Sequence, residues 1–184
     1  MKRPSPRRIV VTGGPGAGKT SLIDALQRRG FPRTVEAGRA IIQDQVRIGG
    51  AALPWADRQA YAQLMLSWDL RSYRETEGRA GPVFFDRGAP DVIGYLRLCG
   101  LPVPFEARAA ARLYRYDTLV FIAPPWPEIF IGDAERRQDL AEARRTYEVM
   151  AEVYPELAYT LVELPRASVE DRADFVLERL AAAP

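Results

Sequence analysis

The 184-residue chain has no histidine and a single cysteine, and each of these shortages excludes a kind of chemistry. Without histidine there can be no histidine-based catalytic triad, no usual zinc site and no histidine acid–base catalysis. The single cysteine, Cys99, cannot form an intrachain disulfide or a cysteine cluster. Any catalysis must therefore use carboxylates, lysine, arginine, hydroxyls and a metal ion held by oxygen atoms.

The sequence also lacks long apolar runs and a strong excess of charge. No stretch is long enough to cross a membrane, and the apolar run after the basic tail at residues 1–6 is too short for a secretory signal, so we expect a cytoplasmic protein. The net charge of +2 gives no reason to expect a nucleic-acid partner. The length predicts one domain over residues 1–184, with 47% hydrophobic residues to build its core.

Residues 13–21, GGPGAGKTS, match the pattern of a phosphate-binding loop. They follow an apolar run at residues 9–11 and precede a helical pattern, which is the context that this motif requires. Glycines let backbone N–H groups point at phosphates, while a lysine brings charge to the β- and γ-phosphates and a threonine hydroxyl binds Mg²⁺. We therefore predict that ATP or GTP, with Mg²⁺ at Thr20, binds at Gly14, Pro15, Gly16, Ala17, Gly18, Lys19, Thr20 and Ser21.

Apolar runs alternate with helical patterns along the rest of the chain. The runs predict strands at residues 9–11, 31–36, 83–85, 118–122 and 160–164. Helical patterns lie at residues 18–29, 37–48, 57–77, 91–99, 104–114, 139–153 and 168–180. This alternation predicts a P-loop NTPase fold of three α/β/α layers, with a parallel sheet of about five strands and ligands at the carboxyl ends of the strands.

Polar residues that follow the second and third predicted strands are the next candidates. Asp86 ends the strand at residues 83–85, where it can hold Mg²⁺, accept a proton from an attacking hydroxyl or simply cap a turn. Arg87 can bind an anionic group of the substrate or form a structural ion pair. Glu36 and Arg39 are expected opposite the phosphate loop, where an acceptor would lie, although Arg39 also fits a solvated helix position.

Three arginines complete the set of candidates. Arg136 and Arg137 lie in a polar segment after a proline-rich stretch, a suitable place for a lid that closes over the transferring phosphate, although such pairs are also common on surfaces. Arg166 follows the last strand and is a candidate for the pocket of the nucleotide base. Trp126 fits packing better than base stacking, and it stays a candidate for the rim of the site. Apolar positions recur at helical spacing in the predicted helix at residues 57–77, which favours packing over a ligand site. These positions are Tyr61, Leu64, Met65 and Trp68, with Tyr73 as a further candidate.

Five motifs together resemble the P-loop kinase-like family described as AAA-type or predicted ATPases, which includes relatives of the nicotinamide riboside kinase domain of the bifunctional NAD-biosynthesis regulator. The motifs are VVTGGPGAGKTSLIDAL, VEAGRAII, VFFDRGAPDVIGYLRL, the APPW segment with the following GDAERR, and VELP. The resemblance covers nearly the whole chain and implies a nucleoside-kinase-like fold with a lid. It implies that VEAGRAII, with Glu36 and Arg39, borders the nucleoside site. It also implies that VFFDR, with Asp86, ends near Mg²⁺ and the acceptor hydroxyl. The segment GDAERR, with Arg136 and Arg137, would form the lid.

The sequence departs from related families at informative positions. Riboside kinases tend to have Asp-Thr after the apolar strand, whereas Asp86-Arg87 is closer to the pair of thymidylate kinases, and this leaves the acceptor open. Water-activating AAA machines have a glutamate after this aspartate, whereas Arg87 follows Asp86 here. The residues therefore do not support the ATPase activity that the family's name suggests. A GTPase switch is disfavoured because no Asn-Lys-x-Asp guanine signature occurs.

The prediction is a kinase that transfers the γ-phosphoryl group of ATP or GTP to a hydroxyl or phosphate of a nucleoside- or nucleotide-like acceptor. Lys19, Asp86, Glu36, Arg136 and Arg137 are its predicted catalytic residues, and Glu36, Arg39 and Arg87 are predicted to bind the acceptor. The alternative is a nucleotide-dependent binding or regulatory module with slow hydrolysis. The oligomeric state stays open, with a homo-oligomer as one option.

Overall fold

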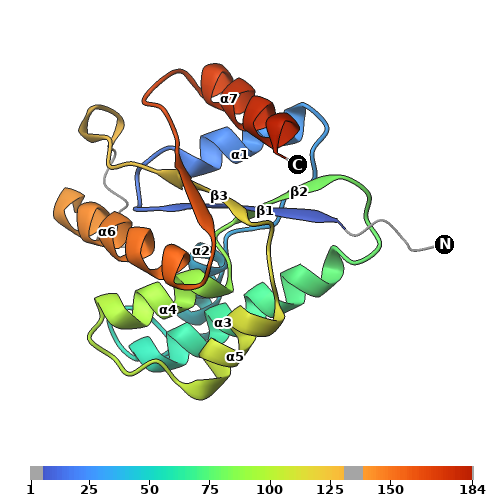
Figure 1. The fold of residues 1–184 in the computed structure, drawn as a ribbon. Helices are drawn as coiled ribbons and strands as arrows, with labels where there is room; N and C mark the ends of the chain where they lie inside the picture. Colours follow the sequence, from blue (N-terminus) through green and yellow to red (C-terminus); the bar gives the residue numbers. More distant parts are fainter. Residues whose placement is uncertain (1–5, 131–138, 184) are drawn as a thin grey trace.

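A four-stranded parallel sheet forms the centre of the computed structural model, which describes residues 6–130 and 139–183 (Figure 1). The order of the strands in the described part is β2-β1-β3-β4. Their bounds are Arg7–Gly13 for β1, Pro82–Asp86 for β2, Leu119–Ala123 for β3 and Thr160–Glu163 for β4. The order is not sequential, so crossover connections with helices join the strands, as parallel sheets require.

Seven α-helices are described, close to the predicted ranges. Asp57 caps α3 by accepting from the backbone N–H of Ala60 at 2.9 Å, and Ser168 caps α7 by accepting from the N–H of Asp171 at 3.1 Å. The helices are α1 (Lys19–Arg28), α2 (Ala37–Ile48), α3 (Arg58–Glu75), α4 (Ala89–Leu98), α5 (Phe105–Leu113), α6 (Leu140–Glu156) and α7 (Val169–Ala182).

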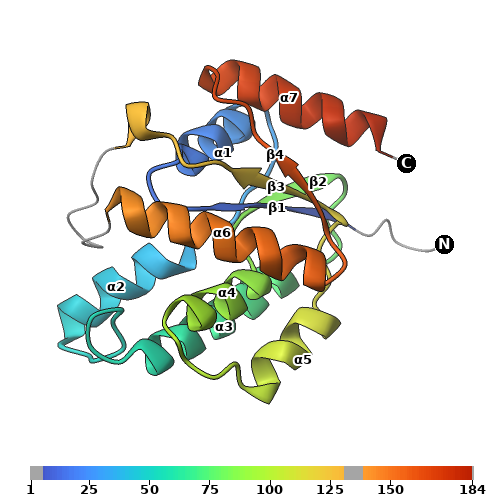
Figure 2. The same ribbon diagram turned by 60° about the vertical axis from the view of Figure 1, so that its left-hand side comes forward.

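Alternating side chains of the strands build one core on each face of the sheet. Ile9 and Val11 of β1 pack with α1 and α7, whereas Val10 packs on the opposite face with α4, α5 and α6. Figures 1 and 2 show α1 and α7 on one side of the sheet and α3 to α6 on the other. The predicted three-layer α/β/α architecture is therefore confirmed.

The strand predicted at residues 31–36 is the one element that the structure corrects. Only Arg33 pairs with β2, in a single parallel bridge to Phe84, so the described sheet has four strands instead of about five. Pro32 has no backbone N–H and contributes only its carbonyl, which accepts from the N–H of Phe84 at 2.9 Å. The chain then leaves the sheet, since Glu36 is already the N-cap of α2.

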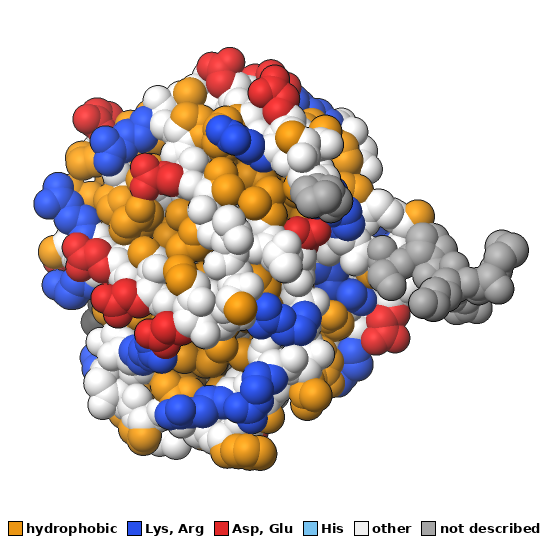
Figure 3. Space-filling view, viewed as in Figure 1, with side chains coloured by type: hydrophobic (Ala, Val, Ile, Leu, Met, Phe, Trp, Pro, Cys, Tyr) orange, Lys and Arg blue, Asp and Glu red, His pale blue; other side chains and the backbone are white. Residues whose placement is uncertain are grey.

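The register of the sheet brings two predicted site segments to one edge. Val11 of β1 lies opposite Asp86 of β2, so the phosphate loop that follows β1 starts beside the end of β2. Charged side chains of both signs are scattered among hydrophobic ones over the face drawn in Figure 3. Within residues 6–130 and 139–183, no helix has the length and apolar character needed to cross a membrane.

Phe121 tests the contribution of the core between the sheet and α1 and α7. Its side chain is fully buried, so Phe121→Ala should lower the free energy of unfolding by about 3–5 kcal/mol, through lost apolar burial and the cavity left behind. Phe105→Ala is the matched control, because Phe105 is 75% exposed and should change stability by less than about 0.5 kcal/mol. Urea unfolding of both variants measures the difference, and equal losses would contradict this packing.

Candidate functional site

The phosphate loop occupies the turn between Gly13, the last residue of β1, and Lys19, the first residue of α1. Gly18 has φ of 72°, in the left-handed region that glycine adopts without strain. At Gly14, an added Cβ would lie 2.3 Å from the carbonyl oxygen of Ala143 on α6. A side chain at position 14 would therefore push the loop and α6 apart.

Lys19 and the start of α1 give this loop an affinity for anions. Lys19 is buried, and its Nζ donates to the carbonyl oxygen of Gly14 at 2.5 Å, so the ammonium group lies across the loop. The N-cap of α1 is Gly18, which has no side chain to cap the helix, and its first turn contains no acidic residue. The backbone N–H groups at the helix start are thus a suitable site for phosphate, with Thr20 exposed in the first turn.

Arg172 of α7 packs against the phosphate loop, a contact that no local sequence pattern predicts. Its side chain is almost fully buried, and its guanidinium donates to the carbonyl oxygens of Ala17 at 3.1 Å and Gly18 at 3.4 Å. Burial lowers the pKa of this guanidinium. The group also lies 5.7 Å from the ring centre of Trp126, so the half-buried tryptophan belongs to the same cluster.

Asp86 and Arg87 stand where β2 ends, as predicted. Asp86 is buried, and the N–H of Arg87 bonds to the carbonyl oxygen of Val11 at 3.1 Å, which continues the pairing of the two strands. Arg87 then turns sharply, with φ of 70°, an uncommon value for a residue with a side chain. Its guanidinium lies 3.5 Å from Glu36 and 3.5 Å from Asp91.

Asp91 organises this corner of the site, although the sequence marked it only as the start of a helix. It is buried in the first turn of α4, where its carboxylate accepts from the backbone N–H of Gly88 at 2.9 Å. It also accepts from the hydroxyl of Thr12 on β1 and from that of Tyr154 on α6 at 2.5 Å. Burial, and then the charge of Asp91, raise the pKa of Tyr154 well above its usual range, which keeps this hydroxyl a donor.

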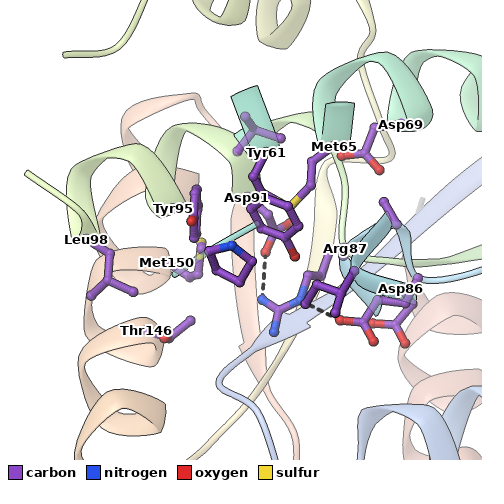
Figure 4. Close-up of a pocket in the computed structure, with 16 residues that line it drawn as sticks. Tyr61, Met65, Asp69, Asp86, Arg87, Asp91, Tyr95, Leu98, Thr146 and Met150 are labelled. Atoms are coloured by element: carbon purple, nitrogen blue, oxygen red, sulfur yellow. Dashed lines mark ion pairs between the residues drawn. The ribbon is translucent and has the colours of Figure 1, made fainter. Parts of the chain in front are cut away.

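A cavity opens between α2, α3, α4 and α6, next to the end of β2 (Figure 4). Its volume is about 710 Å³ including the open mouth. The lining combines carboxylates with aromatic and apolar side chains, and Tyr61 and Met65, predicted only to pack, belong to it. The lining residues are Glu36, Ala37, Gly38, Ile42, Pro54, Tyr61, Met65, Asp69, Asp86, Arg87, Asp91, Val92, Tyr95, Leu98, Thr146 and Met150.

The cavity lies beside the phosphate loop because both border on α6. Ala143 of this helix faces Gly14 of the loop, and Thr146, one turn further along, lines the cavity. A nucleotide on the loop and a second ligand in the cavity would therefore meet near Asp86.

Not every predicted residue faces this cavity. Glu36 does, whereas Arg39 is exposed on α2 and is absent from the lining. Arg166 is exposed as well, and its guanidinium donates to the carbonyl oxygen of Pro125 at 3.0 Å, which links the segments that follow β3 and β4. Arg136 and Arg137 lie outside the described residues.

The donor set fits a magnesium ion held mainly by a bound nucleotide. Within the described ranges, no three histidine, cysteine, aspartate or glutamate residues are grouped so that they could hold a metal ion. Mg²⁺ commonly takes one or two protein ligands and completes its shell with phosphate oxygens and water. Thr20 and Asp86, which supply a hydroxyl and a carboxylate, match that requirement.

Several solved structures share this fold. A deoxyadenosine kinase from M. mycoides, with the products dCMP and dCDP, matches with a TM-score of 0.61 at 11% identity, over 96% of this chain and 100% of that one. A NadR protein in complex with NR matches with a TM-score of 0.64 at 21% identity, over 96% of this chain and 52% of that one. A shikimate kinase from Acinetobacter baumannii in complex with shikimate matches with a TM-score of 0.58 at 15% identity, over 96% of this chain and 93% of that one.

No curated protein matches the chain significantly in sequence. A family model described as "AAA domain" does match, over residues 8–172, which include the phosphate loop, every described wall of the cavity and Arg172. The chain therefore belongs to this AAA domain family, and its fold is that of the P-loop kinases.

Proposed function

We propose that the protein is a small-molecule kinase that transfers the γ-phosphoryl group of ATP, or of GTP, to a hydroxyl or phosphate of a nucleoside- or nucleotide-like acceptor. The observation that carries the proposal is the position of the cavity beside the phosphate loop, with Asp86 at the boundary between them. A protein that only hydrolyses a nucleotide needs no second pocket at this place. The kinases that share the fold are consistent with this proposal.

On the donor side, the loop amides and Lys19 would bind the phosphates of the nucleotide. Thr20 and Asp86 would hold Mg²⁺, which supplies positive charge to the phosphate oxygens. Arg172 keeps the carbonyl oxygens of Ala17 and Gly18 turned away from the bound anion. The loop therefore presents N–H groups, and not carbonyl oxygens, to the phosphates.

On the acceptor side, Asp86 or Glu36 would accept the proton of the attacking hydroxyl. The acceptor oxygen then forms a bond to the γ-phosphorus, while the bond from that phosphorus to the bridging oxygen breaks and the nucleoside diphosphate leaves. Arg87, held between Glu36 and Asp91, positions the carboxylate of Glu36 at the cavity wall. The lid role of Arg136 and Arg137 stays a prediction.

ADP release with ATP and Mg²⁺, measured across nucleosides, nucleotides and small hydroxylated metabolites, tests the proposal. The panel includes nicotinamide riboside and thymidylate. A kinase should show turnover that rises well above background with one acceptor, because transfer requires it. Binding of ATP or GTP with no acceptor-dependent turnover would contradict the proposal and favour the nucleotide-dependent binding module.

Two substitutions separate binding from transfer. Lys19→Ala should weaken triphosphate binding by about 100-fold or more, because it removes a buried cation that would contact the phosphates. Asp86→Asn should leave binding nearly unchanged and lower kcat by about 10²–10⁴-fold, the usual range for loss of an acid–base group. Isothermal titration and initial rates measure the two effects, and transfer at the wild-type rate in Asp86→Asn would refute the role given to this residue.

Arg172→Met tests the support of the phosphate loop. The hydrogen bonds to Ala17 and Gly18 are lost while much of the side-chain volume is kept, so we expect about tenfold weaker ATP binding. Arg179→Met, an exposed change on the same helix, is the control and should bind ATP normally. Titration calorimetry compares the ATP affinities of the two variants, and thermal unfolding verifies that both are folded. An unchanged affinity in Arg172→Met would contradict the role given to Arg172.

A further inference from the structure

Three side chains of α3 at intervals of four residues form one wall of the cavity. Tyr61, Met65 and Asp69 lie on the same face of this helix and all line the cavity. Figure 4 shows Asp69 beside Met65, at the end of the cavity away from Leu98 and Thr146. Asp69 is thus an acidic residue on a face that otherwise supplies aromatic and apolar groups.

Asp69 is buried, and in the part of the chain that the structure describes its carboxyl group makes no hydrogen bond or ion pair. The residue is 8% exposed, yet it faces the cavity. Longer-range interactions with Asp91, Arg87, Asp86 and Glu36 act on it, and so does one with Tyr116. A buried carboxyl group without a partner is costly to the folded protein, so this position contributes nothing evident to stability.

The titration of Asp69 agrees with that geometry. Burial, followed by the negative charge of Asp91, raises the pKa of the Asp69 carboxyl group well above its usual range. The neighbouring Asp91 differs, because it has Gly88, Thr12 and Tyr154 as donors. The two aspartates therefore have different roles: one is a saturated structural group, and the other is available to a ligand.

The charges around the cavity indicate which ligand would use Asp69. The lining contains four carboxylate residues, Glu36, Asp69, Asp86 and Asp91, and Arg87 is its only basic residue among those described. Arg87 is already between two of these carboxylates. An anionic group in the cavity would meet repulsion from these carboxylates, whereas a cation would be attracted by Asp69 and its acidic neighbours.

We propose that Asp69 is a specificity-determining residue that binds a positively charged group of the acceptor, so that the cavity takes a hydroxyl-bearing organic cation and not a nucleoside monophosphate. This inference depends on the proposed function in one respect only, namely that the bound cation is the acceptor of the phosphoryl group. The burial of Asp69, its position on the cavity wall and the excess of carboxylates carry the recognition of a cation independently of any phosphoryl transfer.

A charge series of small probes of nearly equal shape tests the inference on the full chain without nucleotide. Benzamidine is a cation, benzamide is neutral and benzoate is an anion, and all three carry a trigonal group of similar size on a benzene ring. NMR titration at millimolar concentrations should show benzamidine binding about tenfold more tightly than benzamide, with benzoate weakest and shifts at Met65. Equal binding of the three probes, a preference for benzoate, or no binding of benzamidine would overturn the proposal.

The variant Asp69→Asn has nearly the same shape and removes the ionisable carboxyl group. It should lose the preference for benzamidine over benzamide, whereas Asp44→Asn, an exposed change on α2, should keep it. Asp69→Asn should also melt at or above the wild-type temperature at neutral pH, because it removes a buried carboxyl group that gains no partner in the folded state. A retained preference, or a melting temperature lowered by several degrees, would show a structural role for Asp69.

The two proposals fail in different ways. If benzamidine binds through Asp69 and no acceptor raises ADP release, the kinase function fails and the cavity remains a site for a cationic ligand. If acceptor-dependent turnover occurs and the probes bind without regard to charge, the kinase stands and the role of Asp69 fails. An acceptor bearing a phosphate that turns over equally well in wild type and Asp69→Asn would also contradict the inference.

Discussion

The carboxylate of Asp91 joins the parts of the protein that surround the cavity. It accepts hydrogen bonds from Thr12 at the end of β1, from Gly88 before α4 and from Tyr154 of α6, and it lies 3.5 Å from Arg87. A buried charge is stable when its oxygens are satisfied in this way. Strand β1, which leads into the phosphate loop, is thereby fixed against the two helices that bound the cavity.

The contrast with Asp69 shows how stability and ligand binding are divided between two buried aspartates. Asp91 receives donors from three elements, whereas Asp69, among the residues described, receives none. The first group holds the cavity in shape, and the second adds unfavourable free energy to the folded protein in the absence of a ligand. A residue such as Asp69, which destabilises the folded protein and faces a cavity, is better explained by binding of a ligand than by packing.

The sequence predicted what local patterns encode. The phosphate loop, the ends of most elements and the position of Asp86 follow from contiguous motifs and periodicity. The prediction of a strand at residues 31–36 was wrong, because Pro32 has no N–H to extend the pairing and only a single bridge forms. Asp69 and Arg172 were missed because their roles depend on neighbours far away in the chain: Arg172 reaches carbonyl oxygens 155 and 154 residues before it. No helical period distinguishes a buried polar residue from a solvated one when its partner is so distant.

Helix α6 couples the two halves of the site. Ala143 packs on Gly14 of the phosphate loop, Thr146 and Met150 line the cavity, and Tyr154 donates to Asp91. These four positions, spaced by three or four residues, lie on one face of the helix. Under the proposed function, one helix therefore contacts both the loop that holds the nucleotide and the cavity that holds the acceptor, and so helps to set the distance between them. Phosphoryl transfer depends mainly on positioning, so a fixed distance between the substrates is what this chemistry needs from the fold.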